Sequence, residues 1–178
     1  IPSEGKSLTA ANTAMAMAEA GKRVLLIDSD MRLPTIHKKL GFKAAPGLSN
    51  LLVGMNDVEK AIYRLEDKGF DVMPAGNTPP NPTELLGSAR MEKLLNGLSA
   101  HYDYIIIDLP PVTIVSDALV CSKYLNGIVF VVRGGRATTA ELGEAIRQLE
   151  FANVKILGFV YNSAEGAKSN NYSRKYVK

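Results

Sequence analysis

Apolar residues along the chain form short continuous runs that alternate with stretches of helical spacing. Such runs, closed by an acid or a turn, are typical of strands buried on both faces of a sheet. They predict strands at residues 23–28, 70–74, 104–108, 128–132 and 156–161. Between these runs, the spacing predicts helices over residues 7–20, 88–98, 117–124 and 138–149, with shorter helical pieces over residues 48–52 and 58–65.

Local signals support several of the predicted helices. Ser88 has the residue type of a helix N-cap. Thr138 and Glu141 have the spacing of a capping box, in which each side chain bonds the other residue's backbone. The first helix is expected to bury a single apolar stripe made of Leu8, Ala11, Met15 and Ala18.

Alternating strands and helices predict an α/β domain with a mostly parallel sheet and helices on both faces. The domain is expected to span residues 1–162, a length with room for a substantial core. Residues 163–178 are polar and lack periodicity, which predicts a flexible tail. In sheets of this kind, ligands bind beyond the carboxyl ends of the strands.

Composition narrows the functional classes. The chain has 178 residues, of which 46% are hydrophobic, and a net charge of +3, which is too small to indicate a nucleic-acid partner. Its single cysteine, Cys121, excludes an internal disulfide and a cysteine metal cluster, and it fits a reducing compartment. No apolar run approaches the ~20 residues needed to span a bilayer.

The start of the chain carries the chemistry of a phosphate-binding loop. Gly5-Lys6-Ser7 has the ending of a P-loop, G-x-x-x-x-G-K-[ST]. A glycine lets backbone N–H groups approach phosphate, the lysine supplies positive charge, and the serine hydroxyl is a Mg²⁺ ligand. By itself the tripeptide also fits a solvated turn before a helix. The motif's first glycine and the strand that feeds the loop would precede Ile1, so we expect that strand to be missing from this sequence.

Two predicted strands end in acids at the edge where the P-loop would lie. Asp28 closes the strand over residues 23–28, and Asp30 follows it. Asp108 closes the strand over residues 104–108 and has the form of a Walker B acid, which steadies Mg²⁺ through water. Together with Lys6 these acids predict a site for a nucleoside triphosphate and Mg²⁺.

The stretch after the first strand is more specific. Residues 24–34, VLLIDSDMRLP, resemble the Walker A′ motif of the bacterial tyrosine kinases, which are cytoplasmic autokinases that control capsule and exopolysaccharide production. The shared pattern is a hydrophobic strand, then Asp-x-Asp, one residue, an arginine and a nearby proline. This resemblance implies a P-loop NTPase fold of the ParA/MinD-like type.

Other segments carry the same resemblance. Residues 2–7, PSEGKS, are similar to the family's P-G-E-G-K-S loop, with Ser3 in place of a glycine. Residues 80–86, PNPTELL, resemble its P-N-P-[ST]-E-L-L segment, and residues 102–111, YDYIIIDLPP, resemble its Walker B strand. The similarity covers nearly the whole chain, from residue 1 to about residue 162.

The resemblance implies a role for each acid and for the loop lysine. Lys6 would hold the β- and γ-phosphates and Ser7 would bind Mg²⁺. Asp28 would act as the general base toward a tyrosine hydroxyl. Asp30 and Asp108 would hold Mg²⁺ through water. The division of roles between Asp28 and Asp30 stays open at this point.

Further residues belong to the implied site. Arg32 is expected to orient the acids or a neighbouring subunit. Asn162 matches a position that contacts adenine in related ATPases, with a plain turn residue as the alternative. The remaining nucleotide-binding positions are Ser3, Glu4, Gly5 and Leu8.

The resemblance also implies partners. ATP and Mg²⁺ would be the cofactors, and Tyr172 and Tyr176 of neighbouring subunits in a homo-oligomer, such as a ring, would be the phosphorylated tyrosines. A transmembrane activator, fused or separate, would hold the kinase at the inner face of the cell membrane. The family usually ends in a dense tyrosine cluster, whereas this chain has only Tyr172 and Tyr176 near its end.

Two other functions share these motifs. A partition or division-site ATPase of the ParA/MinD type carries a signature lysine five residues before the P-loop lysine, and Ile1 stands there in this chain. A non-catalytic ATP-binding regulator is the second alternative. The intact set of functional side chains argues against it, namely Lys6, Ser7, Asp28, Asp30 and Asp108.

Overall fold

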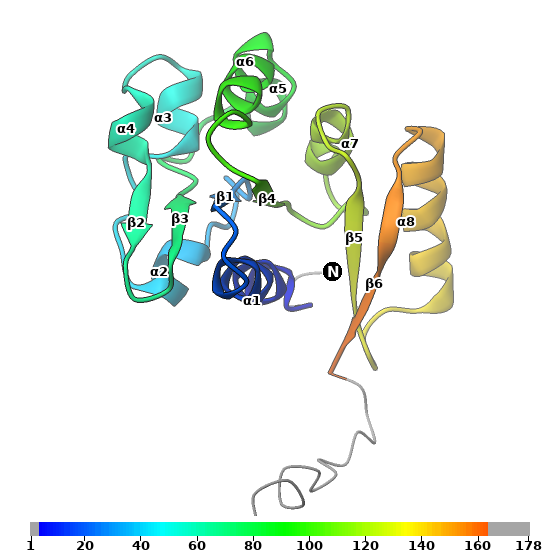
Figure 1. Ribbon diagram of the computed structural model, residues 1–178. Helices are drawn as coiled ribbons and strands as arrows, with labels where there is room; N and C mark the ends of the chain where they lie inside the picture. The colour runs from blue at the N-terminus through cyan, green and yellow to red at the C-terminus, as the bar shows by residue number, and fades with distance from the viewer. Residues whose placement is uncertain (1–3, 164–178) are drawn as a thin grey trace, which may run out of the picture.

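The structure is a computed structural model that describes residues 4–163. Its strands form a four-stranded sheet in the order β2-β3-β1-β4 and a two-stranded sheet of β5 and β6 (Figure 1). The strands are β1 Val24–Asp28, β2 Tyr63–Leu65, β3 Phe70–Met73, β4 Tyr104–Asp108, β5 Ile128–Arg133 and β6 Ile156–Asn162. All of the pairings are parallel except that of β2 with β3, which confirms the predicted α/β class.

Helices fill the connections between the strands. They are α1 Lys6–Glu19, α2 Ile36–Leu40, α3 Leu48–Leu52, α4 Val58–Ala61, α5 Pro82–Leu86, α6 Ala89–Leu98, α7 Asp117–Ser122 and α8 Thr139–Phe151. Ser88 caps α6, with its hydroxyl accepting a bond from the Met91 N–H at 3.3 Å. Thr138 and Glu141 form the predicted capping box of α8.

Two clusters of buried side chains cover the two faces of the larger sheet. On one face Ala11 and Ala14 of α1 pack with Val24, Leu26 and neighbouring side chains of β1 and β3. On the other face the β1 side chains Leu25 and Ile27 pack against residues of α3, α5, α6 and α7. Figure 1 shows these helices above the sheet, with α1 and α2 below it. Because alternate residues of β1 face opposite clusters, all five of its side chains are buried.

Two local predictions were wrong. Helix α1 buries Ala11 and Ala14, while Leu8 and Met15 are exposed, because small side chains let the helix approach the sheet closely. Residues 58–65 were expected to be helical, but the helix ends at Ala61 and β2 follows. The pairing of β2 with β3 adds an antiparallel edge strand, a contact that helical spacing could not reveal.

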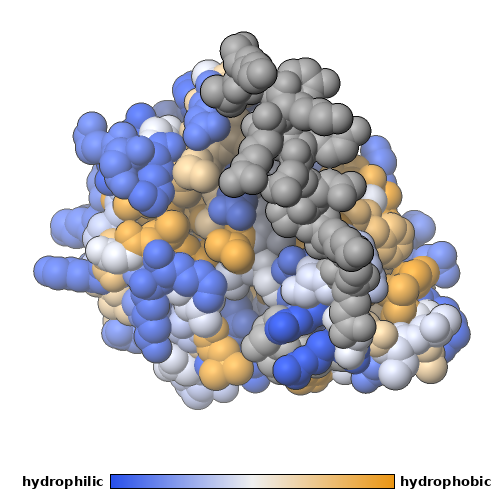
Figure 2. Space-filling model, turned by 90° about the horizontal axis from the view of Figure 1, so that it is seen from below, coloured by the Kyte–Doolittle hydropathy of each residue, from blue (hydrophilic) through white to orange (hydrophobic). Residues whose placement is uncertain are grey.

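Strands β4 and β5 are not hydrogen-bonded to each other. An apolar groove of about 810 Å³ runs between them and is lined along its length by both strands, with α1, α6 and α8 beside them. Residues 104–108 and 128–132 were expected to be buried strands, but β4 and β5 are largely half-buried because, within residues 4–163, each has an edge on this groove that pairs with no other strand. Seen from below, apolar side chains form several separate patches on this face of the molecule (Figure 2). Among residues 4–163, no helix is long and apolar enough to cross a membrane.

Candidate nucleotide-binding and catalytic site

The two strand-ending acids lie next to each other. The parallel pairing of β1 with β4 sets Asp28 opposite Asp108, and the Ser29 N–H donates to the Asp108 carbonyl oxygen at 2.9 Å. Only 4% of Asp108 and none of Asp28 is exposed to solvent. The predicted convergence at the carboxyl ends of the strands is therefore present.

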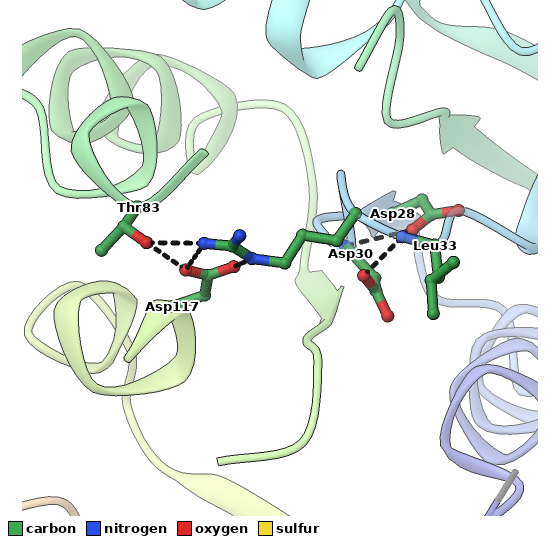
Figure 3. Close-up of polar contacts among 6 residues, drawn as sticks. Asp28, Asp30, Leu33, Thr83 and Asp117 are labelled. Atoms are coloured by element: carbon green, nitrogen blue, oxygen red, sulfur yellow. Dashed lines mark hydrogen bonds and ion pairs between the residues drawn. The ribbon is translucent and has the colours of Figure 1, made fainter. Parts of the chain in front are cut away.

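Backbone N–H groups hold the carboxylates of the loop that follows β1. One carboxylate oxygen of Asp28 accepts from the Asp30 N–H at 3.2 Å, and the other accepts from the Ile36 N–H at 3.1 Å. The Asp30 carboxylate accepts from the Leu33 N–H at 3.0 Å. Asp28, Asp30 and Leu33 appear together in Figure 3. The loop is thus folded around its own acids, and the direction of each carboxylate depends on the loop's shape.

Burial makes both strand-ending acids weaker than usual. It raises the pKa of Asp28 to about 7, with the nearby Asp108 as the next cause. Burial also raises the pKa of Asp108 to about 6, although a hydrogen bond with the Ser7 side chain and the charge of Lys6 oppose the rise. Two ionised carboxylates side by side repel each other, and a divalent cation would relieve this repulsion. The electrostatics therefore suit a Mg²⁺ site.

Gly5 gives the P-loop its turn into α1. Its φ of 91° lies in the left-handed region, and a Cβ built there would stand 2.1 Å from the Asn162 side-chain nitrogen. The same nitrogen donates to the Glu4 carbonyl oxygen at 2.9 Å. The loop is thus tied to the end of β6, and Asn162 contacts the backbone of the predicted phosphate loop. Its predicted contact with adenine stays a prediction.

Lys6 and Ser7, the first residues of α1, face the acids. The Lys6 ammonium lies 3.2 Å from the Glu4 carboxylate and is largely shielded from solvent. Ser7 is hydrogen-bonded to Asp108, and its hydroxyl oxygen also accepts from the Thr35 hydroxyl at 3.2 Å. The helix N-terminus, the ammonium group and the hydroxyl therefore converge beside the two strand ends, an arrangement that binds phosphate.

The three predicted metal ligands lie near one another. Ser7 bonds Asp108, and the charge of Asp30 contributes to the raised pKa of Asp108, so the three predicted ligands belong to one site. Within the part of the chain that the structure describes, no group of three or more His, Cys, Asp or Glu side chains could hold a metal ion. Mg²⁺ usually keeps waters and takes phosphate oxygens, so one hydroxyl and two carboxylates fit that ion.

Arg32 forms side-chain contacts with two residues that the sequence did not suggest as its partners. Its guanidinium binds Asp117 in a bidentate pair, with nitrogen–oxygen distances of 2.9 and 3.2 Å, and it donates to the Thr83 hydroxyl at 3.0 Å. The Thr83 hydroxyl in turn donates to Asp117. No motif relates Arg32 to a residue 85 positions later, so spacing could not have found Asp117. Ser3, Tyr172 and Tyr176 lie outside the described residues.

A left-handed glycine, a lysine and serine opening a helix, and buried acids ending neighbouring strands define a P-loop nucleoside-triphosphate-binding domain. A family model described as an AAA domain matches residues 3–133. The EpsB protein of Ralstonia nicotianae is 40% identical over 164 residues, which are 92% of this chain and 22% of EpsB. The tyrosine-protein kinase YwqD of Bacillus subtilis is 37% identical over 171 residues, which are 96% of this chain and 72% of YwqD.

A solved structure of a tyrosine kinase also superposes on this chain. The kinase domain of the Escherichia coli tyrosine kinase Etk superposes with a TM-score of 0.89 at 36% identity, covering 92% of this chain and 64% of that one. The chain belongs to the family of bacterial tyrosine-protein kinases.

More distant structures share the fold alone. MinD of Pyrococcus horikoshii, solved with Mg-ADP, has a TM-score of 0.74 at 22% identity. Cobyrinic acid a,c-diamide synthase of Mycobacterium smegmatis, solved with an ATP analogue and magnesium, has a TM-score of 0.77 at 22% identity. These matches bear out the predicted ParA/MinD-like fold.

Proposed function

We propose that this chain is the catalytic domain of a protein-tyrosine autokinase. In this role it transfers the γ-phosphoryl group of ATP to Tyr172 and Tyr176 of neighbouring subunits and thereby regulates capsular or exopolysaccharide synthesis and export. The observation that carries the proposal is the placement of two buried acids, Asp28 and Asp108, beside Lys6 and Ser7. Membership in the tyrosine-kinase family supports the choice of tyrosine as acceptor.

The chain's own residues divide the chemistry as follows. Lys6 and the N-terminus of α1 compensate the phosphate charge, and the tyrosine oxygen attacks the γ-phosphorus as the bond to the β-phosphate oxygen breaks, releasing ADP. Asp28 accepts the tyrosine proton, and its pKa of about 7 is near the pH at which a general base works well. Bound Mg²⁺, held by Ser7, Asp30 and Asp108, would neutralise charge on the phosphates. The ATP analogue, ADP and magnesium found in fold relatives support these cofactors.

Incubation with radiolabelled ATP, followed by blotting for phosphotyrosine, tests the proposal. The parent chain should become labelled on tyrosine only with Mg²⁺ present, and Lys6→Met should not, because each lost charge-assisted contact is worth roughly 1.5–3 kcal/mol. Lys60→Met, which removes an exposed lysine paired with Asp57, is the matched control and should behave like the parent. ATP hydrolysis without phosphotyrosine would favour a ParA/MinD-type ATPase, and binding without turnover would favour a non-catalytic regulator.

We also propose a transmembrane activator, fused or separate, that keeps the kinase at the cytoplasmic face of the membrane, and a homo-oligomer in which tails reach neighbouring sites. Membership in the family of bacterial tyrosine-protein kinases supports this part of the proposal. Co-expression with a candidate membrane protein should move the chain to the membrane fraction and raise its tyrosine phosphorylation. A chain that stays equally active and monomeric in both settings would contradict this part of the proposal.

The groove between β4 and β5 supports a proposal about the domain's extent. We infer that it receives a parallel strand from the segment leading into the P-loop, because P-loops connect a strand to a helix and both flanking strands have an unpaired edge on this apolar groove. Hydrogen–deuterium exchange should show β4 and β5 amides slowing when the natural segment upstream of Ile1 is present. Amides that exchange equally fast in both chains would exclude this placement.

A further inference from the structure

Three separate segments meet around one buried carboxylate. Asp117 begins α7 and has no exposed surface, Thr83 lies in the first turn of α5, and Arg32 lies in the loop after β1. Figure 3 shows the side chains of Thr83 and Asp117 pointing toward each other, and the Thr83 hydroxyl donates directly to Asp117. We call this group of Arg32, Thr83 and Asp117 the loop clamp.

The clamp is the counter-charge arrangement that a buried carboxylate requires. An ionised Asp117 without partners would carry a large desolvation cost, because burial removes its water. Arg32 offsets that cost with two N–H donors in a planar fork, while the Thr83 hydroxyl bonds both residues. The two bonds to Asp117 also fix the orientation of the Arg32 guanidinium, because a bidentate pair holds the planar group in one direction.

A continuous chain of bonds links the clamp to the acids of the site. Leu33 directly follows Arg32, and its N–H holds the Asp30 carboxylate at 3.0 Å. The Asp30 N–H in turn holds the Asp28 carboxylate at 3.2 Å. A shift of the backbone at Arg32 would therefore change the position of the Leu33 N–H and, through it, the directions of the Asp30 and Asp28 carboxylates (Figure 3).

We propose that Thr83 and Asp117 are positioning residues for phosphoryl transfer, which set the directions of Asp28 and Asp30 through Arg32. The assignment rests on the proposed kinase function. It also gives a role to the PNPTELL segment, because Thr83 joins that segment to the loop after β1. Arg32 acts in the same way and does not itself touch the phosphates. Displacement of a catalytic group by about 1 Å can cost on the order of 10²-fold in rate, so a small loosening of the clamp has a measurable effect.

The pair Thr83→Val and Thr83→Ser tests the clamp with little change in volume. Thr83→Val keeps the shape of the side chain and removes the hydroxyl, whereas Thr83→Ser keeps the hydroxyl. Thr83→Val should lower kcat roughly tenfold or more with little change in the KM for ATP, and Thr83→Ser should restore most of the loss. Arg64→Lys, in a surface ion pair with Asp71, is a control expected to behave like the parent.

Arg32→Lys keeps the charge but loses the planar fork, so it should lower kcat as Thr83→Val does. The double variant should lose much less than the product of the single losses, because both changes loosen the same contact. A Thr83→Val protein with parent kcat, or one whose kcat falls only in proportion to its unfolded fraction, would overturn the proposal. Multiplicative losses in the double variant would also overturn it.

A second measurement separates this proposal from the kinase assignment. Hydrogen–deuterium exchange at the Leu33 and Asp30 amides reports the loop directly and needs no activity. Thr83→Val should speed exchange at these amides at least severalfold, while amides of β1 and β3 exchange as in the parent. If the parent makes no phosphotyrosine but Thr83→Val still speeds exchange at these amides, the proposed kinase function is wrong and the proposed role of the loop clamp in holding the loop is supported. Unchanged exchange at both amides would contradict the proposed role of the loop clamp, whatever the kinase activity of the variant.

Discussion

Asp28 and Asp108 lie opposite each other at the ends of two paired parallel strands, so two buried carboxyl groups share one edge of the sheet. Their raised pKa values follow from this placement, because each group has lost water and each lies near other carboxylates. Such a pair favours a cation, and Lys6 and Ser7 stand beside it at the start of α1. The nucleotide site therefore arises from strand register, since the register alone sets the two acids side by side.

Substitution of the two acids should separate their roles. Asp28→Asn removes the proposed base, so phosphotransfer should fall by about 10²-fold or more while ATP affinity stays nearly unchanged, because the loss is in the transition state. Asp108→Asn removes a proposed Mg²⁺ contact and should also weaken Mg²⁺-dependent ATP binding. Binding titrations with and without Mg²⁺, together with single-turnover rates, make the comparison. Equal losses of ATP affinity in both variants would show that these roles are assigned wrongly.

Gly5→Ala should damage the P-loop more than its size suggests. The new methyl group would meet the Asn162 side chain, and the left-handed φ of 91° would cost roughly 1–2 kcal/mol for a residue with a Cβ. ATP affinity should therefore fall at least tenfold in an equilibrium titration. Gly97→Ala in α6 is the matched control, because a Cβ there meets nothing within 4 Å. It should leave ATP binding unchanged and raise stability by roughly 0.5–1 kcal/mol. Parent-like ATP affinity in Gly5→Ala would contradict this account of the loop.

Cys121 should be inert in the folded chain. Burial raises the pKa of its thiol to about 12, with the charge of Asp117 as the next cause, so the thiol stays protonated at neutral and mildly alkaline pH. A thiol reagent such as DTNB at pH 8 should react with the denatured chain at least 10²-fold faster than with the native chain. Fast stoichiometric reaction of the native protein would show that the Cys121 thiol, on α7, is not buried in the core. Slow reaction of Cys121 with DTNB can also be used to check that the loop-clamp variants are folded.

Several elements could be predicted from the sequence because their signals are local. The strands that end at Asp28 and Asp108, and the caps at Ser88 and Thr138, follow from short apolar runs and from side chains that bond nearby backbone. The meeting of Asp28 and Asp108 could be predicted as well, because parallel strands bring their carboxyl ends to one edge of the sheet.

Other features depend on contacts that no local pattern contains. The edge strand β2 exists because of its pairing with β3, and its three residues carry too little signal against the helical spacing before them. The half-buried state of β4 and β5 depends on what lies between them, which their own apolar sequences do not encode. The pairing of Arg32 with Asp117 joins segments far apart in the chain, and only the packing of α5 and α7 brings them together.

The tail is the remaining link between the site and its proposed substrate. The proposed transfer between subunits requires a tyrosine that one subunit can present to another, and Tyr172 and Tyr176 lie in the polar stretch after residue 163. The tyrosines within the described residues fall in elements or beside them, and Tyr102 is bonded to Asp71 at 2.8 Å. Transfer between subunits is therefore expected to use the tail.

Mixing two disabled proteins tests this expectation. One carries Lys6→Met and cannot transfer phosphate, and the other keeps its site but carries Tyr172→Phe and Tyr176→Phe. Phosphate should appear on Tyr172 or Tyr176 of the Lys6→Met partner, at a rate that rises with the concentration of the active one. Each phosphate adds about −1.5 to −2 charge, so modified tails gathered in one assembly should repel each other and favour dissociation in light-scattering measurements. Mass spectrometry that finds phosphate only on tyrosines of the folded body would exclude the tail as the substrate.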